Sequence, residues 1–286
     1  MKMVKLIEKY KVFSIFFLIF IIGLLSYRDY GLAIDDEIYR ENGIYYKNLI
    51  KEYLILLSKF DFNGIKILEE EIYNNPIRNH PAIFETTLAF LSEIFNIEEI
   101  NEIYYLSHFF NFFIFSCSLF TFYIILSRRF KSSLVSLIAI LTIFFSPRFF
   151  AESFYNSRDI YFFSIFTFNI FTIQNLITKE NKKNIFFFCL SSALLISSKI
   201  LGLICFIVFI TIYLFKKILN SSIKDALNKT LRILVITYLL IVILWPYLWF
   251  DPFSNLINAF KDIINEHNQL KISTLFLGEY FSSTST

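Results

Sequence analysis

Residues 104–127 read YYLSHFFNFFIFSCSLFTFYIILS and contain no Asp, Glu, Lys or Arg. An α-helix needs roughly 20 such residues to cross the hydrocarbon core of a bilayer, so this stretch is predicted to be a transmembrane helix. The composition of the 286-residue chain agrees, because 56% of the residues are hydrophobic and only 18% are charged. A water-soluble protein of this length carries a smaller apolar share and more charge. The expected fold class is therefore an all-α, polytopic membrane protein.

Six further apolar runs lie on either side of this stretch: Val12–Tyr27, Ser132–Ser146, Ile160–Thr178, Ile185–Ser198, Ile200–Phe215 and Ile233–Phe250. Several are shorter than the roughly 20 residues of an ordinary span. Flanking Lys and Arg side chains can reach back to the interface and a bilayer can thin locally, so about seven transmembrane helices are predicted. For Ile185–Ser198 and Ile200–Phe215, the alternative is one long element broken around Lys199.

The distribution of charge predicts the orientation. With the N-terminus in the cytoplasm, the cytoplasmic segments hold 15 of the 27 Lys and Arg residues and 3 of the 24 Asp and Glu residues. Cytoplasmic loops of membrane proteins show this excess of basic residues. We therefore expect a multi-pass protein of the bacterial inner (plasma) membrane, with residues 28–102, 147–159 and 251–286 in the periplasm. Trp245 and Trp249, just before the last of these segments, are expected in an aromatic belt at the membrane interface.

The first periplasmic loop, residues 28–102, is too long for a plain connector. Within Asp36–Lys59 apolar and charged residues recur with helical spacing, which predicts a helix at the membrane interface. A turn at Asn74–Pro76 precedes a second amphipathic stretch, Ala82–Phe95. The loop is therefore expected to hold two or more amphipathic interface helices.

Three consecutive acids, Asp35, Asp36 and Glu37, follow the first apolar run closely. As helix caps they would favour the N-terminal dipole by roughly 0.3–1 kcal/mol. They are also suited to binding a cation or to accepting a proton from a nucleophile, since adjacent carboxylates raise the proton affinity of one of them. The run itself leaves these alternatives open.

Other charged residues fall near the predicted outer ends of the spans. Asp159 opens the fourth apolar run beside Arg158, seven residues after Glu152. It is suited to an ion pair or a helix cap, or to acting as a second acid on the face of the first, with Arg148 or Arg158 available to an anionic phosphate. Lys199 is either a loop residue or an anion contact. His80 lies in a loop, where a lone histidine is more often a surface residue than a ligand.

Sequence motifs of several enzyme classes are missing. The chain has no P-loop, GxGxxG, GxSxG, HExxH or CxxC motif, and its three cysteines fall inside apolar runs without the spacing of metal ligands. Nucleotide-driven transport, nicotinamide chemistry and zinc peptidase activity therefore have no support, and no nucleic-acid partner is expected.

Four segments carry a family resemblance through their order and spacing: Ile34–Arg40 (IDDEIYR), His80–Glu85 (HPAIFE), Ser153–Ile160 (SFYNSRDI) and Trp245–Trp249 (WPYLW). The chain resembles the GT-C superfamily of membrane glycosyltransferases over nearly its whole length, residues 1–286. The most similar group is that of the protein O-mannosyltransferases and aminoarabinose transferases.

This resemblance implies transfer of a sugar from a polyprenyl-phosphate donor to a lipid, glycan or protein acceptor on the periplasmic face, with inversion. Asp36 is implied as the catalytic base, with Asp35 as the alternative and Glu37 beside them, and Asp159 as the acid of the second loop. The implied contacts of the substrate are Arg40, His80, Glu152, Arg158 and Lys199. No resident cofactor is expected; three clustered acids are compatible with a divalent metal, but none is predicted. Besides donor and acceptor, the expected partners are membrane lipids.

Superfamily members usually continue with several more spans after the seventh. By that comparison the chain is expected to be a shortened copy that lacks the C-terminal spans, with residues 251–286 as a periplasmic tail. Two other classes of function stay open, a non-catalytic remnant or assembly subunit and a polytopic transporter or flippase of lipid-linked sugars. A transporter should carry ionisable residues near mid-membrane, whereas here the charges cluster at span ends.

Overall fold

The computed structural model describes residues 2–33, 35–75, 78–269, 273–276 and 279–282. Over these ranges the chain is helical apart from one short antiparallel β-ribbon, which confirms the predicted helical class. The elements are α1 Lys2–Ser26, α2 Asp36–Ser58, α3 Phe62–Asn74, α4 Ile83–Ile94, α5 Ile100–Phe130, α6 Ser133–Phe144, α7 Pro147–Tyr155, α8 Ser157–Thr178, α9 Lys182–Ile196, α10 Leu201–Asn220, α11 Ile223–Leu244, η1 Pro246–Trp249 (a 3₁₀ helix), α12 Pro252–Gln269, β1 Ser273–Phe276 and β2 Glu279–Ser282.

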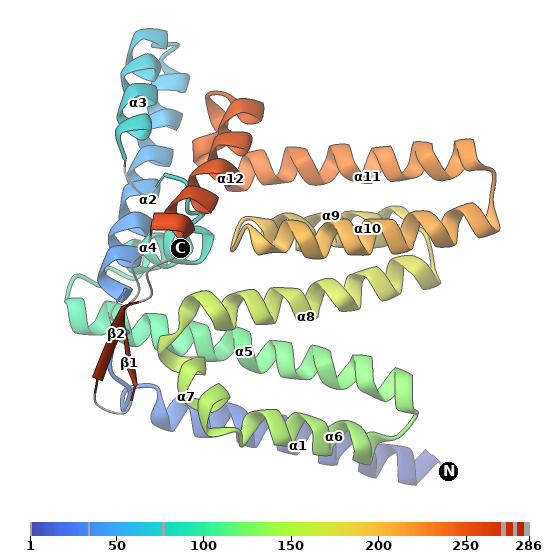
Figure 1. Cartoon of the computed structure of the whole chain (residues 1–286). Helices are drawn as coiled ribbons and strands as arrows, with labels where there is room; N and C mark the ends of the chain where they lie inside the picture. Colours follow the sequence, from blue (N-terminus) through green and yellow to red (C-terminus); the bar gives the residue numbers. More distant parts are fainter. Residues whose placement is uncertain (1, 34, 76–77, 270–272, 277–278, 283–286) are drawn as a thin grey trace.

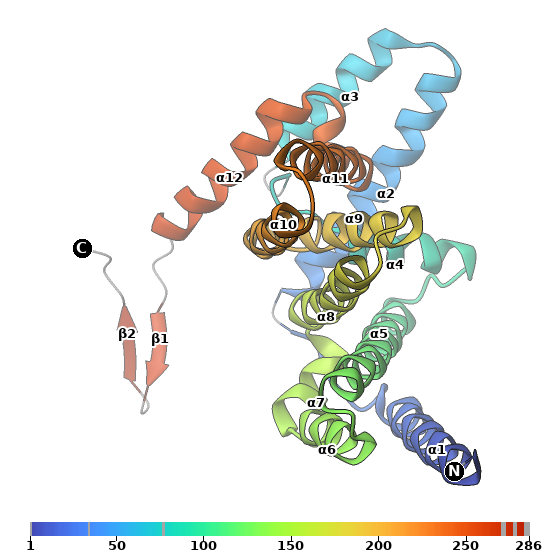
Figure 2. The same cartoon turned by 90° about the vertical axis from the view of Figure 1, so that its right-hand side faces the viewer.

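The long apolar helices form a layered bundle. In Figure 1, α1, α5, α6, α8, α9, α10 and α11 run side by side, and the chain reverses direction between successive members; Figure 2 shows most of them end-on. Within the bundle, α8 packs against both α5 and α9, and α9 packs against α11. All seven predicted apolar runs are therefore at least partly helical.

Length separates these helices into two groups. Four of them, α5, α8, α10 and α11, are long and apolar enough to cross a membrane, and α6 with α7 would make a fifth as one span bent by 65°. The bend falls at Pro147, where Ser146 is extended (ψ 118°), as expected of a residue before proline. In α1 the apolar part, Tyr10–Ser26, is shorter. The described residues thus indicate a multi-pass membrane protein with four or five candidate spans, and the predicted count of seven is not confirmed.

The turn between α9 and α10 shows whether the runs Ile185–Ser198 and Ile200–Phe215 form one broken element or two helices. The two helices pack against each other, with the rings of Phe188 and Phe206 6.1 Å apart. A Cβ at Gly202 would lie 2.5 Å from the carbonyl oxygen of Leu195, so glycine permits the close return of the chain. The two runs are therefore separate helices folded back on each other, and the alternative of one element broken around Lys199 does not hold.

The remaining elements gather at one end of the bundle, and their helices are called the outer helices below. In Figure 1, α2, α3, α4, α7, α12 and the β-ribbon all lie there, while the α5–α6, α8–α9 and α10–α11 turns lie at the other end, near the N-terminus. The helix predicted over Asp36–Lys59 is α2, and the stretch Ala82–Phe95 contains α4. Because α2 runs across the direction of the bundle helices, it is placed as an interface helix would be.

Aromatic side chains join helices α2 and α3 to the segment after α11. Trp245 is only 1% exposed and belongs to one core cluster with Tyr46 of α2 and Tyr247 of η1. The hydroxyl of Tyr73 donates to Oδ1 of Asn255, 3.1 Å away. Trp245 is therefore a core residue and not part of an interfacial belt, because the outer helices cover it.

Candidate functional site

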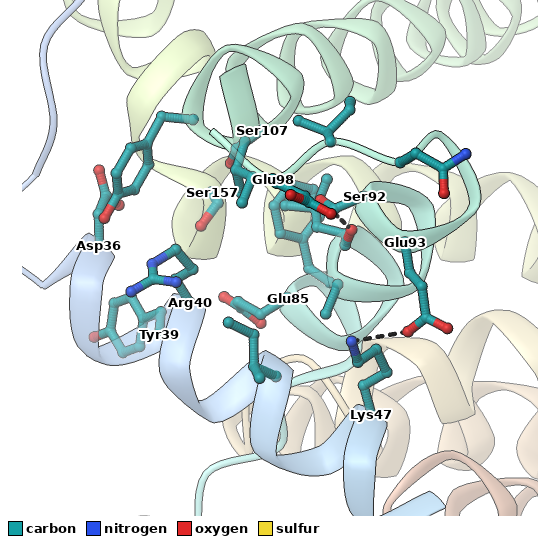
Figure 3. Close-up of a pocket in the computed structure, with 18 residues that line it drawn as sticks. Asp36, Tyr39, Arg40, Lys47, Glu85, Ser92, Glu93, Glu98, Ser107 and Ser157 are labelled. Carbon is teal, nitrogen blue, oxygen red and sulfur yellow. Dashed lines mark hydrogen bonds and ion pairs between the residues drawn. The ribbon is translucent and has the colours of Figure 1, made fainter. Parts of the chain in front are cut away.

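A cavity of about 280 Å³ lies at the end of the bundle that carries the outer helices, between α2, α4 and the first turns of α5 and α8. Figure 3 shows polar side chains pointing into it from both sides. Helix α2 contributes Asp36, Tyr39 and Arg40, and α4 contributes Glu85. The cavity therefore gathers residues from parts of the chain that are far apart in sequence.

Helical spacing places these residues on facing surfaces. In α2, Asp36 and Arg40 are four residues apart and share one side of the helix. Between the two helices, Gly43 has no side chain to hold them apart. A Cβ at that position would lie 2.5 Å from both the carbonyl carbon and the carbonyl oxygen of Glu85. The close contact of α2 with α4, which forms one wall of the cavity, therefore depends on this glycine.

The structure separates the three acids of the predicted run. Asp35 and Glu37 are exposed, and Asp35 holds the N-cap position of α2 without a capping hydrogen bond from its side chain. Asp36 alone lines the cavity, and its Oδ2 accepts a hydrogen bond from the backbone N–H of Ala33 at 2.7 Å. Burial raises the pKa of Asp36, opposed by that hydrogen bond and assisted by the charge of Asp35. Of the three, Asp36 is placed as a proton acceptor.

Two guanidinium groups lie at this site. Arg40 lines the cavity, and its buried Nε has no hydrogen-bond partner among the described residues. The guanidinium carbon of Arg158 lies 4.1 Å from the centroid of the Tyr39 ring, which places it against the first turn of α2. Of the two predicted contacts, Arg40 therefore lines the cavity together with Asp36, whereas Arg158 lies beside it against Tyr39 without lining it. A planar guanidinium can bind two phosphate oxygens at once.

Glu85 was missed as a site residue by the sequence analysis. It is 8% exposed and forms no ion pair among the residues that the structure describes. Burial raises the pKa of its carboxyl group, opposed by the charge of Arg158 and assisted by that of Asp36. Its spacing was a usable signal: Glu85 precedes Leu88 by three positions and Ser92 by seven, so it falls on the buried face of α4.

At the other end of the cavity the charges are paired. The carboxylate of Glu93 forms an ion pair with Nζ of Lys47 at 2.9 Å and another with Lys51, as Figure 3 shows for Lys47. Hydrogen bonds from Lys51 and Lys47 lower the pKa of Glu93 to about 2. The cavity thus has one end with paired charges, while Asp36, Arg40 and Glu85 line it with no ion pair among the described residues.

The predicted second acid, Asp159, lies near this site without lining the cavity. It stands in the first turn of α8, where its N–H donates to Oδ1 of Asn156 at 3.1 Å and its carboxylate forms an ion pair with Lys199. The ion-pair interpretation of Asp159 is therefore confirmed, whereas the cap interpretation is wrong, because Asn156 holds the N-cap position of α8 and Asp159 only donates its N–H to it. Lys199 is engaged by this carboxylate, so it is not an unpaired cation at the cavity.

Glu152 and His80 also lie outside the cavity lining. The carboxylate of Glu152 accepts a hydrogen bond from Nε of Arg148 at 2.8 Å, one helical turn away in α7. The backbone carbonyl of His80 accepts a long hydrogen bond, 3.5 Å, from Nδ2 of Asn42. Within the described ranges, no group of three His, Cys, Asp or Glu side chains is arranged to hold a metal ion.

Comparison with protein-family models, with curated proteins and with solved structures found no significant match. The residues of the cavity combine a half-buried carboxylate, a buried carboxyl group and the guanidinium group of Arg40 at one end of an apolar bundle, and the guanidinium group of Arg158 lies beside this lining. This set can accept a proton and stabilise an anion.

Proposed function

We propose that this chain is a membrane glycosyltransferase that moves a sugar from a polyprenyl-phosphate donor to a lipid, glycan or protein acceptor. One observation carries the proposal: Asp36 and Arg40 line the same cavity, the first as a carboxylate of raised pKa and the second with an unpartnered Nε. Transfer from a sugar phosphate needs both a base and a group that stabilises the departing phosphate.

In the proposed reaction Asp36 removes the proton of the acceptor hydroxyl or amine. The freed electron pair attacks the anomeric carbon, and the bond from that carbon to the phosphate oxygen breaks on the opposite side, with inversion. The bonding electrons leave with the lipid phosphate, whose negative charge Arg40 and Arg158 stabilise. Because burial raises the pKa of Asp36, its carboxylate is a stronger base than an exposed aspartate.

The position of the cavity suits a lipid-linked donor. It opens between α2 and α4, at the end of a bundle that contains four or five candidate spans. A volume of about 280 Å³ is near the lower limit of about 300 Å³ for ligand pockets, so it suits a sugar phosphate and leaves the polyprenyl chain to the membrane. The basic turns lie at the opposite end of the bundle, which supports a periplasmic site in a bacterial inner membrane.

The test is sugar turnover from a radiolabelled polyprenyl-phosphate donor in membranes that contain the full chain. Asp36→Asn should reduce transfer by at least about 100-fold, within the usual contribution of a general base. Glu41→Gln is the matched control, because this exposed acid lies on the same helix and does not line the cavity. Unchanged transfer by Asp36→Asn would refute the role of the base. Absence of transfer by the wild type would favour a non-catalytic subunit.

A further inference from the structure

A second, larger cavity lies toward the opposite end of the bundle from the site above. It has a volume of about 640 Å³ and is formed by α8, α9 and the turn between them. Three phenylalanines, Phe168, Phe171 and Phe187, give it an apolar wall, and Lys179 and Lys183 stand at the turn. This second cavity, called the groove below, is therefore apolar along the helices and basic where the chain turns.

A third basic residue belongs to this groove. Arg128, in the last turn of α5, donates from Nη1 to Oδ1 of Asn175, 2.8 Å away. Its guanidinium carbon lies 4.8 Å from the centroid of the Phe171 ring. Since Asn175 and Phe171 both line the groove, Arg128 adds a positive charge to the same end as the two lysines.

Among the described residues, no acid lines the basic end of the groove. Glu180 is the only Asp or Glu from residue 160 to residue 224. Its carboxylate is bound by Lys217 at 2.5 Å and by Lys229 at 3.2 Å, and it does not line the groove. Among the described residues, neither Lys179 nor Lys183 forms an ion pair, so an anion with an apolar tail is the complementary ligand.

We infer that this groove binds an anionic glycerophospholipid of the surrounding membrane. The phosphate lies at Lys179, Lys183 and Arg128, and one acyl chain lies along the phenylalanine rings. Basic pockets between transmembrane helices bind anionic headgroups in this way. A zwitterionic lipid is disfavoured, because its ammonium group would face three cations. The site uses no residue of the proposed catalytic cavity, so it is independent of the proposed function.

The experiment measures binding of fluorescently labelled phosphatidylglycerol to the purified full chain in a neutral detergent, with labelled phosphatidylcholine as the comparison lipid. The variant K179Q/K183Q should bind phosphatidylglycerol about 25-fold more weakly, from roughly fivefold for each lysine. The matched control is K131Q/K224Q, which removes the same charge from exposed positions at the same end of the bundle. The variant K179R/K183R keeps the charge and should retain binding.

Four outcomes would overturn the inference. The first is equal binding of the two lipids by the wild type, and the second is unchanged binding by K179Q/K183Q. The third is an equal loss in K131Q/K224Q, which would show a general attraction to the basic end and no defined site. The fourth is displacement of the labelled lipid by soluble glycerol phosphate at a concentration similar to that of the lipid, which would show that the groove recognises phosphate without the acyl chain.

Discussion

Replacing Gly43 with alanine tests the packing that forms the proposed catalytic cavity. The new Cβ would lie 2.5 Å from the carbonyl carbon and oxygen of Glu85, whereas ordinary contacts begin at 3.4 Å. Helices α2 and α4 must therefore separate by roughly 1 Å at this point. Such overpacking costs about 1–3 kcal/mol, and the better helix propensity of alanine returns about 1 kcal/mol. The expected net destabilisation is about 0–2 kcal/mol for Gly43→Ala and larger for Gly43→Val.

The midpoint of thermal unfolding in detergent measures the stability, and donor turnover measures the effect on the site. A displacement of about 1 Å can reduce a rate by about 100-fold, so transfer should fall more than stability does. Gly31→Ala is the control, because a Cβ at Gly31 has no atom within 4 Å. Wild-type stability and transfer in both Gly43→Ala and Gly43→Val would refute the conclusion that a glycine is needed between α2 and α4.

Three further predictions concern single side chains. Burial, and after it the charge of Asp35, raise the pKa of Asp36 above 3.8, and transfer should fall as the pH falls through that raised pKa. Asp35→Asn removes one of these causes, so it should move the acid limb of the rate profile to lower pH. Burial raises the pKa of Glu85 above 4.5, so the folded state binds the carboxyl proton more tightly than the unfolded chain does. The free energy of unfolding should therefore decrease as the pH rises from 4.5 through the raised pKa, and Glu85→Gln should remove this pH dependence. The buried Nδ2 of Asn169 donates to two serine hydroxyls of α9, at 2.7 and 2.9 Å, so Asn169→Ala should lower the free energy of unfolding by about 1–2 kcal/mol.

Each of these has an outcome that contradicts it. An acid limb that stays in place in Asp35→Asn would mean that Asp36 does not set it. A pH slope that is unchanged in Glu85→Gln would mean that another group is responsible. For Asn169, the control is Thr211→Ala, because the exposed hydroxyl of Thr211 bonds only to its own helix at Ile207; equal effects of the two substitutions would remove the claim for an interhelical bond.

Helical periodicity and apolar length were sufficient to predict most elements. The stretch Asp36–Lys59 became α2 almost to the residue, and each predicted apolar run contains a helix, because both patterns are local properties of the chain. The number of spans was not confirmed, because α9 has only 15 residues and α6 ends at Phe144, before the turn at Pro147. Whether a short apolar helix crosses a bilayer depends on its neighbours, which its own sequence does not contain.

The site was predictable only in part. A run of three acids pointed to a turn of the chain that lines the cavity, but only the packing of α2 against α4 distinguishes Asp36 from Asp35 and Glu37. The pairing of Asp159 with Lys199 joins residues 40 positions apart, and no local pattern specifies it. Trp245 was placed at the membrane interface because tryptophan is common there, and the outer helices bury it instead.

Arg40 and Glu85 favour a ligand site over a packing defect as the origin of this cavity. Buried polar groups are normally paired, since an unpaired one costs stability. Here the buried Nε of Arg40 has no partner among the described residues, and Glu85 is buried without an ion pair there, yet the two line one cavity from facing helices. Gly43 allows those two helices to approach closely at Glu85, because a Cβ there would lie 2.5 Å from the carbonyl group of Glu85. Proteins tend to leave buried polar groups unpaired at sites where those groups bind a ligand and not another part of the protein.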